Sequence, residues 1–233
     1  MMATDLPRLY FRLFDVAPCG SLDAEGARAL RDFGVPAEAR IARQPNGKPF
    51  IQCGSITAAV GIGISRARVI DGEFAAIAMI EQRDIGLDIE PLNQPATNAA
   101  FQDSISGAED LDARRRLISR GLDDGLGLWC IKEAALKGSG DVLTDPRDLA
   151  VRYRNGLWRV QPSLRASAPT PDFDVVLFRL SNAFRCRLLA AIALRAGIGD
   201  DTAAMAQKFQ DAFRSEMPDW RIASLLDPSF AMD

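Results

Sequence analysis

The sequence FAAIAMIEQRDIGLDIE, residues 74–90, holds two apolar runs on either side of a short polar link. The first run, residues 74–80, is apolar throughout, and in the second, residues 85–90, apolar side chains alternate with others. Both lengths suit a β-strand, and neither run is long enough for a helix of ordinary size. We therefore predict two strands that pair as a β-hairpin through the polar residues 81–84.

Alternation in the second run places Gly86, Asp88 and Glu90 on the strand face opposite the apolar residues. Two carboxylates at positions i and i+2 suit Mg²⁺, which binds one or two carboxylates together with phosphate oxygens and water. Gly86 would leave space for a ligand to approach the backbone. A solvent-exposed strand face would show the same polar pattern, so this segment alone leaves both interpretations open.

A second candidate set lies on a predicted helix, residues 125–138. Glu133 and Lys137 are four residues apart and share one face of that helix, with Lys132 beside them. One interpretation is a solvent-exposed Glu–Lys pair, which contributes only about 0.3–0.5 kcal/mol. The other is a third carboxylate for the metal, flanked by two ammonium groups that bind phosphate oxygens.

The remaining pattern predicts an α+β protein with two halves, residues 1–84 and 85–198, and an acidic helical tail, residues 199–233. The tail has 3 basic and 7 acidic residues. Further elements are expected as strands at 9–14, 149–154, 157–160, 173–180 and 184–193, helices at 23–33, 108–120 and 202–226, and a polar loop at 91–106.

Composition excludes several classes of protein. The chain has no histidine, which removes Ser-His-Asp triads, Cys-His nucleophiles and histidine-containing zinc sites. The net charge of −3 argues against a duplex nucleic acid as the main partner. No apolar run approaches the roughly 18 residues of a membrane span, and the first residues lack the pattern of a signal peptide. We therefore expect a cytoplasmic protein with neither nucleic-acid nor membrane partners.

Taken together, the two candidate segments resemble a known family. Gly86-Leu87-Asp88-Ile89-Glu90 is followed, 41 residues after Asp88, by Trp129-Cys130-Ile131-Lys132-Glu133-Ala134-Ala135-Leu136-Lys137. This pair of motifs resembles the signature of the 4′-phosphopantetheinyl transferase superfamily, in its larger surfactin-synthetase-activator type. The resemblance covers roughly residues 10–195 and leaves the acidic tail outside.

The resemblance implies a fold and an activity. The fold would be a pseudo-dimer in one chain, a monomer with two similar halves, each an antiparallel sheet packed on a long helix. The activity would be transfer of the 4′-phosphopantetheine arm of coenzyme A to a serine of an acyl, polyketide or peptidyl carrier protein, with release of adenosine 3′,5′-bisphosphate.

The resemblance also implies roles for the candidate residues. Asp88, Glu90 and Glu133 would hold Mg²⁺ on the diphosphate, and Lys137, with Lys132, would stabilise charge on the leaving group. Glu133, directly or through a metal-bound water, is the expected proton acceptor for the serine, with the diphosphate itself as the alternative.

Two upstream segments extend the comparison to the nucleotide end of coenzyme A. Asn46-Gly47-Lys48-Pro49 resembles the Gly-Lys-Pro turn of the family, and Ile64-Ser65-Arg66-Ala67 stands where the family has Ile-Ser-His-Ser. Lys48, Ser65 and Arg66 are therefore candidate cofactor-binding residues, with Arg66 in place of the usual histidine. An arginine can bind a phosphate bidentately, so the substitution is compatible with the same task.

Two other functions stay open at this point. One is a divergent, non-catalytic module that binds coenzyme A or a carrier protein, and the other is an unrelated Mg²⁺-dependent enzyme acting on nucleotides or phosphates. Because carrier proteins of this class are acidic, the docking face of a transferase is expected to hold arginine or apolar residues, and Arg114, Arg115, Arg116 and Arg120 are candidates.

Overall fold

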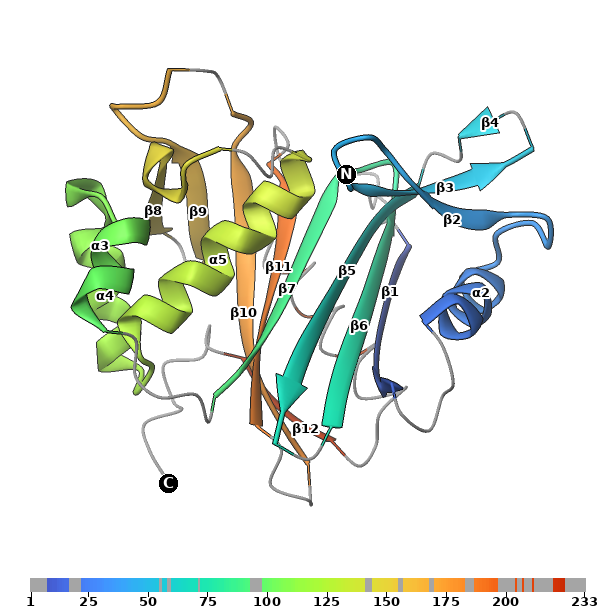
Figure 1. Ribbon diagram of the computed structural model, residues 1–233, viewed down its shortest axis with the longest axis horizontal. Helices are drawn as coiled ribbons and strands as arrows, with labels where there is room; N and C mark the ends of the chain where they lie inside the picture. Colours follow the sequence, from blue (N-terminus) through green and yellow to red (C-terminus); the bar gives the residue numbers. More distant parts are fainter. Residues whose placement is uncertain are drawn as a thin grey trace, which may run out of the picture.

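The computed structural model shows a mixed α+β fold with antiparallel sheets (Figure 1). The residues that it describes are 8–16, 22–54, 56–57, 60–70, 72–92, 98–140, 144–154, 157–167, 170–182, 187–196, 204, 207, 211 and 220–224. Among them, no helix combines the length and the hydropathy needed to cross a bilayer.

The N-terminal part of the chain forms a three-stranded sheet in the order β1-β6-β5, with a helix on one face. Apolar residues of the helix α2 (Leu22–Asp32) pack against side chains of the sheet, among them Tyr10, Ile77 and Met79. A small second sheet, in the order β2-β3-β4, lies beside this helix (Figure 1). The strands of these two sheets are β1 (Leu9–Asp15), β5 (Val60–Val69), β6 (Gly72–Glu81), β2 (Arg40–Arg43), β3 (Pro49–Cys53) and β4 (Ile56–Thr57).

The rest of the chain forms a larger sheet in the order β7-β11-β10-β9-β8, with β12 beside β10. Its strands are β7 (Ile85–Pro91), β8 (Leu149–Arg154), β9 (Leu157–Pro162), β10 (Phe173–Asn182), β11 (Arg187–Arg195) and β12 (Trp220–Ser224). Its helices are α3 (Ala99–Ile105), α4 (Leu111–Ser119) and α5 (Asp124–Ser139), with 3₁₀ turns η1 (Ala108–Asp110) and η2 (Pro146–Asp148).

The two main sheets lie side by side, with β5 next to β7 (Figure 1), and they share a core on one face, while each carries a helix on its other face. Side chains such as Leu13 from the first sheet and Leu87 from the second form the core that the two sheets share. A separate core lies between the other face of the larger sheet and α5. This layering follows from strands that are apolar on both faces, because a strand buried on both sides needs a cover on each.

The predicted hairpin at residues 74–90 is wrong, although both of its strands exist. β6 pairs with β1 and β5, whereas β7 pairs with β11 of the larger sheet. The chain changes sheets over residues 82–84, where Gln82 has a positive φ of 58°. Both strands are buried on both faces, so each becomes part of a different sheet in the same core instead of pairing with the other.

Two other expectations also differ from the structure. The region predicted as a polar loop contains α3, whose first turn is capped by the Asn98 side chain accepting a hydrogen bond from the Phe101 N–H. In the tail, Ala204, Gln207 and Asp211 are helical, but Trp220–Ser224 is strand β12, where the helix was expected to continue to residue 226. Residues 184–186 of the strand predicted at 184–193 lie outside the described residues.

The space beside Gly86, which was expected to admit a ligand, is filled by α5. A Cβ atom at this position would lie 1.8 Å from the Ala134 carbonyl oxygen and 2.5 Å from the Gly138 nitrogen. The absence of a side chain therefore lets α5 lie directly on β7. This close approach brings the polar residues of the two elements within contact distance of each other.

Candidate functional site

The candidate site lies where β5, β7 and α5 meet. The predicted alternation along β7 is confirmed, because Ile85, Leu87 and Ile89 belong to the core that the two sheets share. Asp88 lies on the opposite face, where it contacts α5. As a result, the carboxylate of Asp88 is enclosed between the sheet and the helix, with only 2% of the residue exposed.

Asp88 is held from two sides. Its Oδ1 atom accepts hydrogen bonds from Ser65 Oγ of β5 at 3.1 Å and from Lys137 Nζ of α5 at 2.6 Å. Ser65 Oγ also accepts a hydrogen bond from the Ile89 N–H, which lies on the edge of β7 away from β11. Ser65 therefore fixes the position of both the backbone and the carboxylate of the strand.

The second carboxylate oxygen of Asp88, Oδ2, is buried and accepts no hydrogen bond within the described part of the chain. A buried carboxylate oxygen without a donor costs free energy, and such an atom in a native structure calls for an explanation. A cation or a hydrogen-bond donor from a ligand would satisfy it.

Glu90 shares the face of Asp88 and is the most strongly perturbed carboxylate of the site. Burial and the charge of Asp88 raise the pKa of Glu90 to about 7, and Glu133 contributes in the same direction. The indole Nε1 of Trp129 donates a hydrogen bond to Glu90 Oε1 at 3.0 Å, which opposes the shift. An acidic group whose charge is disfavoured in this way is typical of functional sites.

Glu133 and Lys137 complete the cluster from α5. Lys137 Nζ lies 2.6 Å from Asp88 Oδ1 and 3.9 Å from Glu133 Oε1, so the ammonium group stands between the strand and helix carboxylates. Burial raises the pKa of Glu133. Burial alone would lower the pKa of Lys137, but the hydrogen-bonded Asp88 and nearby Glu133 raise it above its usual value.

The raised pKa of Glu90 makes the stability of the protein depend on pH. The folded protein keeps the Glu90 proton up to about pH 7, whereas the unfolded chain loses it near the ordinary value of 4.5. The free energy of unfolding should therefore fall as the pH rises from about 4.5 to 7. We expect Glu90→Gln to be more stable than the wild type at pH 8 by about 1–3 kcal/mol and equally stable at pH 4.

Urea unfolding at the two pH values, in the presence of a chelator, measures this difference. Glutamine keeps an oxygen that can accept the Trp129 hydrogen bond, so the substitution changes mainly the charge. Glu38→Gln, at an exposed residue outside the cluster, is the matched control for the loss of one carboxylate. An equal effect of Glu90→Gln at both pH values would contradict the assignment.

The carboxylates of the site do not form a complete set of metal ligands within the described part of the chain. Among the described residues, no three Asp, Glu, Cys or His side chains are arranged to hold a metal ion by themselves. The chemistry of the donor set nevertheless fits Mg²⁺, because this ion takes only one or two protein carboxylates and fills its other positions with phosphate oxygens and water. The unpartnered Asp88 Oδ2 is the atom on which this fit depends.

Lys132 does not lie in the cluster. Its side chain is fully buried on another side of α5, where Nζ donates hydrogen bonds to Asp110 Oδ2 at 2.7 Å and to three backbone carbonyls. The three carbonyls are those of Ile105, Pro146 and Leu149. The expectation that Lys132 borders the same site is therefore wrong, and its contacts connect α5 to α3, η1, η2 and β8.

Lys48 is also engaged within the protein. Its Nζ donates to Asp84 Oδ1 at 2.7 Å and to the Gly138 carbonyl at 2.6 Å, and the neighbouring Asn46 donates to the Gly140 carbonyl. The turn at residues 45–49 thus binds the C-terminal end of α5, where free carbonyls and a partial negative charge favour an ammonium group. In this conformation Lys48 stabilises the helix end and does not face the Asp88 cluster.

Arg66 is separated from Ser65 by the alternation of β5. Ser65 points inward to Asp88, whereas the Arg66 side chain is 52% exposed and lies 3.6 Å from Glu73 of β6. Of the predicted cofactor-binding residues, the structure therefore brings Ser65 and Lys137 to the carboxylates and places Lys48, Arg66 and Lys132 elsewhere.

Sequence reasoning missed two partners of the predicted residues, Asp84 and Asp110. Asp84 follows β6 and holds Lys48, and Asp110 at the start of α4 holds Lys132. No periodicity or spacing connects a carboxylate to a lysine 22 or 36 residues away, so these pairs become visible only in three dimensions. Trp129 did belong to the recognised motif, but its hydrogen bond to Glu90 was not predicted.

Comparison with known proteins adds no further assignment. The chain matches no protein-family model and no curated protein sequence.

Proposed function

We propose that the chain is a 4′-phosphopantetheinyl transferase, which moves the phosphopantetheine arm of coenzyme A to a serine of a carrier protein. The observation that carries the proposal is the meeting of Asp88 from β7 and Glu133 from α5 around the Lys137 ammonium group. The two motifs that resemble the family are 41 residues apart in sequence, and they meet at one site in the fold. The two helix-covered sheets would be the related halves of the pseudo-dimer.

The proposed reaction assigns a task to each residue of the cluster. The serine oxygen forms a bond to the phosphorus that carries the pantetheine arm, and the bond from that phosphorus to the bridging oxygen breaks. Adenosine 3′,5′-bisphosphate leaves with the electron pair. Glu133, whose pKa is raised by burial, accepts the serine proton, and Lys137 stabilises the charge on the phosphate oxygens.

Asp88 and Glu90 would hold Mg²⁺ as two carboxylates on one face of β7, and Ser65 would keep Asp88 in place. The bound ion would neutralise charge on the diphosphate, which is the main requirement of phosphoryl-type transfer. For this, Lys137 would turn from Asp88 toward the phosphate oxygens, and its flexible side chain allows the change. Glu90 would lose its proton when the ion binds.

A non-catalytic module that binds coenzyme A or a carrier protein is the second candidate. The observation that favours it is the engagement of Lys48 and Lys132 in internal contacts, together with the exposed, displaced position of Arg66. Against it stands the cost of enclosing carboxylates that repel one another, since a module that only binds has no use for such a cluster.

One experiment separates the two candidates. We expect the purified chain, incubated with coenzyme A, Mg²⁺ and a panel of apo-carrier proteins, to add one phosphopantetheine mass to at least one carrier, as read by mass spectrometry. A chelator should abolish the mass gain. Binding of coenzyme A or of a carrier without any mass gain would support the non-catalytic module and reject the transferase.

A further inference from the structure

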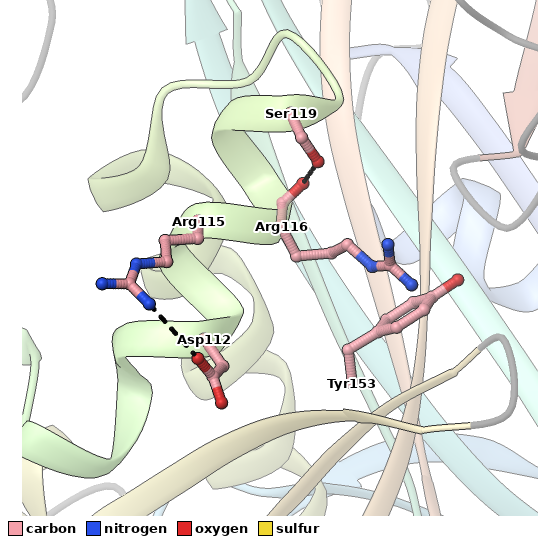
Figure 2. Close-up of a pocket in the computed structure, with 5 residues that line it drawn as sticks. All are labelled: Asp112, Arg115, Arg116, Ser119 and Tyr153. Atoms are coloured by element: carbon pink, nitrogen blue, oxygen red, sulfur yellow. Dashed lines mark hydrogen bonds and ion pairs between the residues drawn. The ribbon is translucent and has the colours of Figure 1, made fainter.

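The outer face of α4 carries a basic surface that the proposed reaction does not use. Figure 2 shows Asp112, Arg115, Arg116 and Ser119 of the helix arranged around an open pocket that Tyr153 of β8 closes on the other side. The pocket has a volume of about 360 Å³. We call this surface, together with Arg120, Leu111 and Ile118, the α4 patch.

The arginines of this helix differ in how they are paired. Arg114 forms an ion pair with Asp124 at 2.6 Å, so its charge is compensated inside the protein. Arg116 and Arg120 instead lie against the Tyr153 ring, 4.4 and 5.1 Å from its centroid, and neither forms an ion pair with a carboxylate in the described part of the chain. Their charges remain available to an acidic partner.

The Arg115 side chain is largely exposed to solvent. It is 71% exposed, and its contact with Asp112, whose side chain is 95% exposed, is 3.9 Å long, a geometry that contributes little. Leu111 and Ile118, which are 51% and 58% exposed, stand on the same helix face as Arg115, four residues before it and three after. The patch therefore combines positive charge with apolar area, although the whole chain has a net charge of −3.

The patch is connected to the candidate site through α5. Leu117 of α4 packs against Gly127 of α5, where a Cβ atom would lie 2.7 Å from the leucine side chain. Glu133 stands six residues further along the same helix, which corresponds to about 9 Å along its axis. α4 therefore packs on the same helix that carries Glu133 of the carboxylate cluster.

We propose that the α4 patch docks an acidic, amphipathic helix of the carrier protein that receives the phosphopantetheine arm. This inference rests on the proposed function. The carboxylates of such a helix complement Arg115, Arg116 and Arg120, and its apolar side chains cover Leu111 and Ile118. Complementary charge of this kind speeds association and fixes the orientation of the partner.

Charge reversal of the patch tests the proposal. With the apo-carrier that the wild type modifies best, Arg115→Glu/Arg116→Glu should raise the KM for the carrier at least about tenfold. The kcat and the KM for coenzyme A should stay within about twofold of the wild type, because neither arginine belongs to the Asp88 cluster. Ile118→Ser should raise the same KM by a smaller factor.

Single variants allow a matched control. Arg165→Glu makes the same change in net charge as Arg115→Glu, at a half-exposed arginine outside the patch that pairs with Asp145 and Asp148. Arg165→Glu should leave the KM for the carrier unchanged. A carrier in which lysine replaces an acidic residue of the docking helix should restore a low KM with the Arg115→Glu variant. Equal effects of Arg165→Glu and Arg115→Glu would overturn the proposal, because net charge alone would then be responsible.

A direct binding measurement separates this proposal from the proposed function. Fluorescently labelled apo-carriers are titrated with the wild type and the double variant, without coenzyme A or Mg²⁺. Binding to the wild type that the double variant loses supports the patch even if no transfer occurs. Equal binding of both proteins, or binding of no carrier by either, overturns it.

Discussion

Glu133→Gln is expected to lower the kcat for phosphopantetheine transfer by about 10²- to 10⁴-fold, the range for losing a general base. Glutamine has nearly the same shape, but it can neither accept the serine proton nor offer a charged oxygen to a metal ion. Because Glu133 lies beside Lys137 and close to Asp88, its loss affects the centre of the cluster. Steady-state kinetics with saturating coenzyme A and carrier measure the change.

Stability distinguishes this role from a structural one. Burial raises the pKa of Glu133, so its charge is a cost to the folded protein, and removing that charge should leave the free energy of unfolding equal or higher at pH 8. The control Glu38→Gln should change neither activity nor stability. A Glu133→Gln protein that keeps more than a tenth of the wild-type kcat would reject the assignment of the proton acceptor.

The sequence was most informative where one element decides the environment of its own residues. Alternation along β7 assigns Asp88 and Ile89 to opposite faces, and the structure confirms it with the core that the two sheets share on one side and α5 on the other. In the same way, the spacing of Glu133 and Lys137 on one helix correctly predicts their contact. Local periodicity is sufficient in both cases, because the backbone geometry fixes which side chains share a face.

Sequence reasoning failed where the answer depends on which elements become neighbours. The runs at residues 74–80 and 85–90 read as a hairpin, but β6 pairs with β1 and β5, and β7 pairs with β11 of the other sheet. The role of Gly86 could not be predicted either, since α5, which fills the space above it, lies about 50 residues further along the chain. Lys132 is adjacent to Glu133 in sequence, but adjacent residues of a helix point in different directions. Lys132 therefore lies outside the site to which Glu133 belongs.

Lys132→Met is expected to lower the free energy of unfolding by about 3–5 kcal/mol, the usual cost of removing one partner of a buried ion pair. Both side chains of the Lys132–Asp110 pair are fully buried, and the ammonium group also satisfies three carbonyls. Burial lowers the pKa of Lys132, but the contact with Asp110 opposes this shift and favours the charged form. Urea unfolding of the variant measures the loss.

A double-mutant cycle shows whether the loss belongs to the pair. Lys132→Met/Asp110→Asn removes both charges and should lose less stability than the sum of the two single variants, because no unpaired charge then stays buried. The exposed pair Arg115–Asp112 is the matched control, and Arg115→Met should change stability by less than about 0.5 kcal/mol. If Lys132→Met instead kept full stability and raised the KM for coenzyme A, Lys132 would be a cofactor-binding residue, as its place in the motif first indicated. The four hydrogen bonds of its ammonium group oppose that outcome, since a lysine that binds phosphate in the site would have to break all of them.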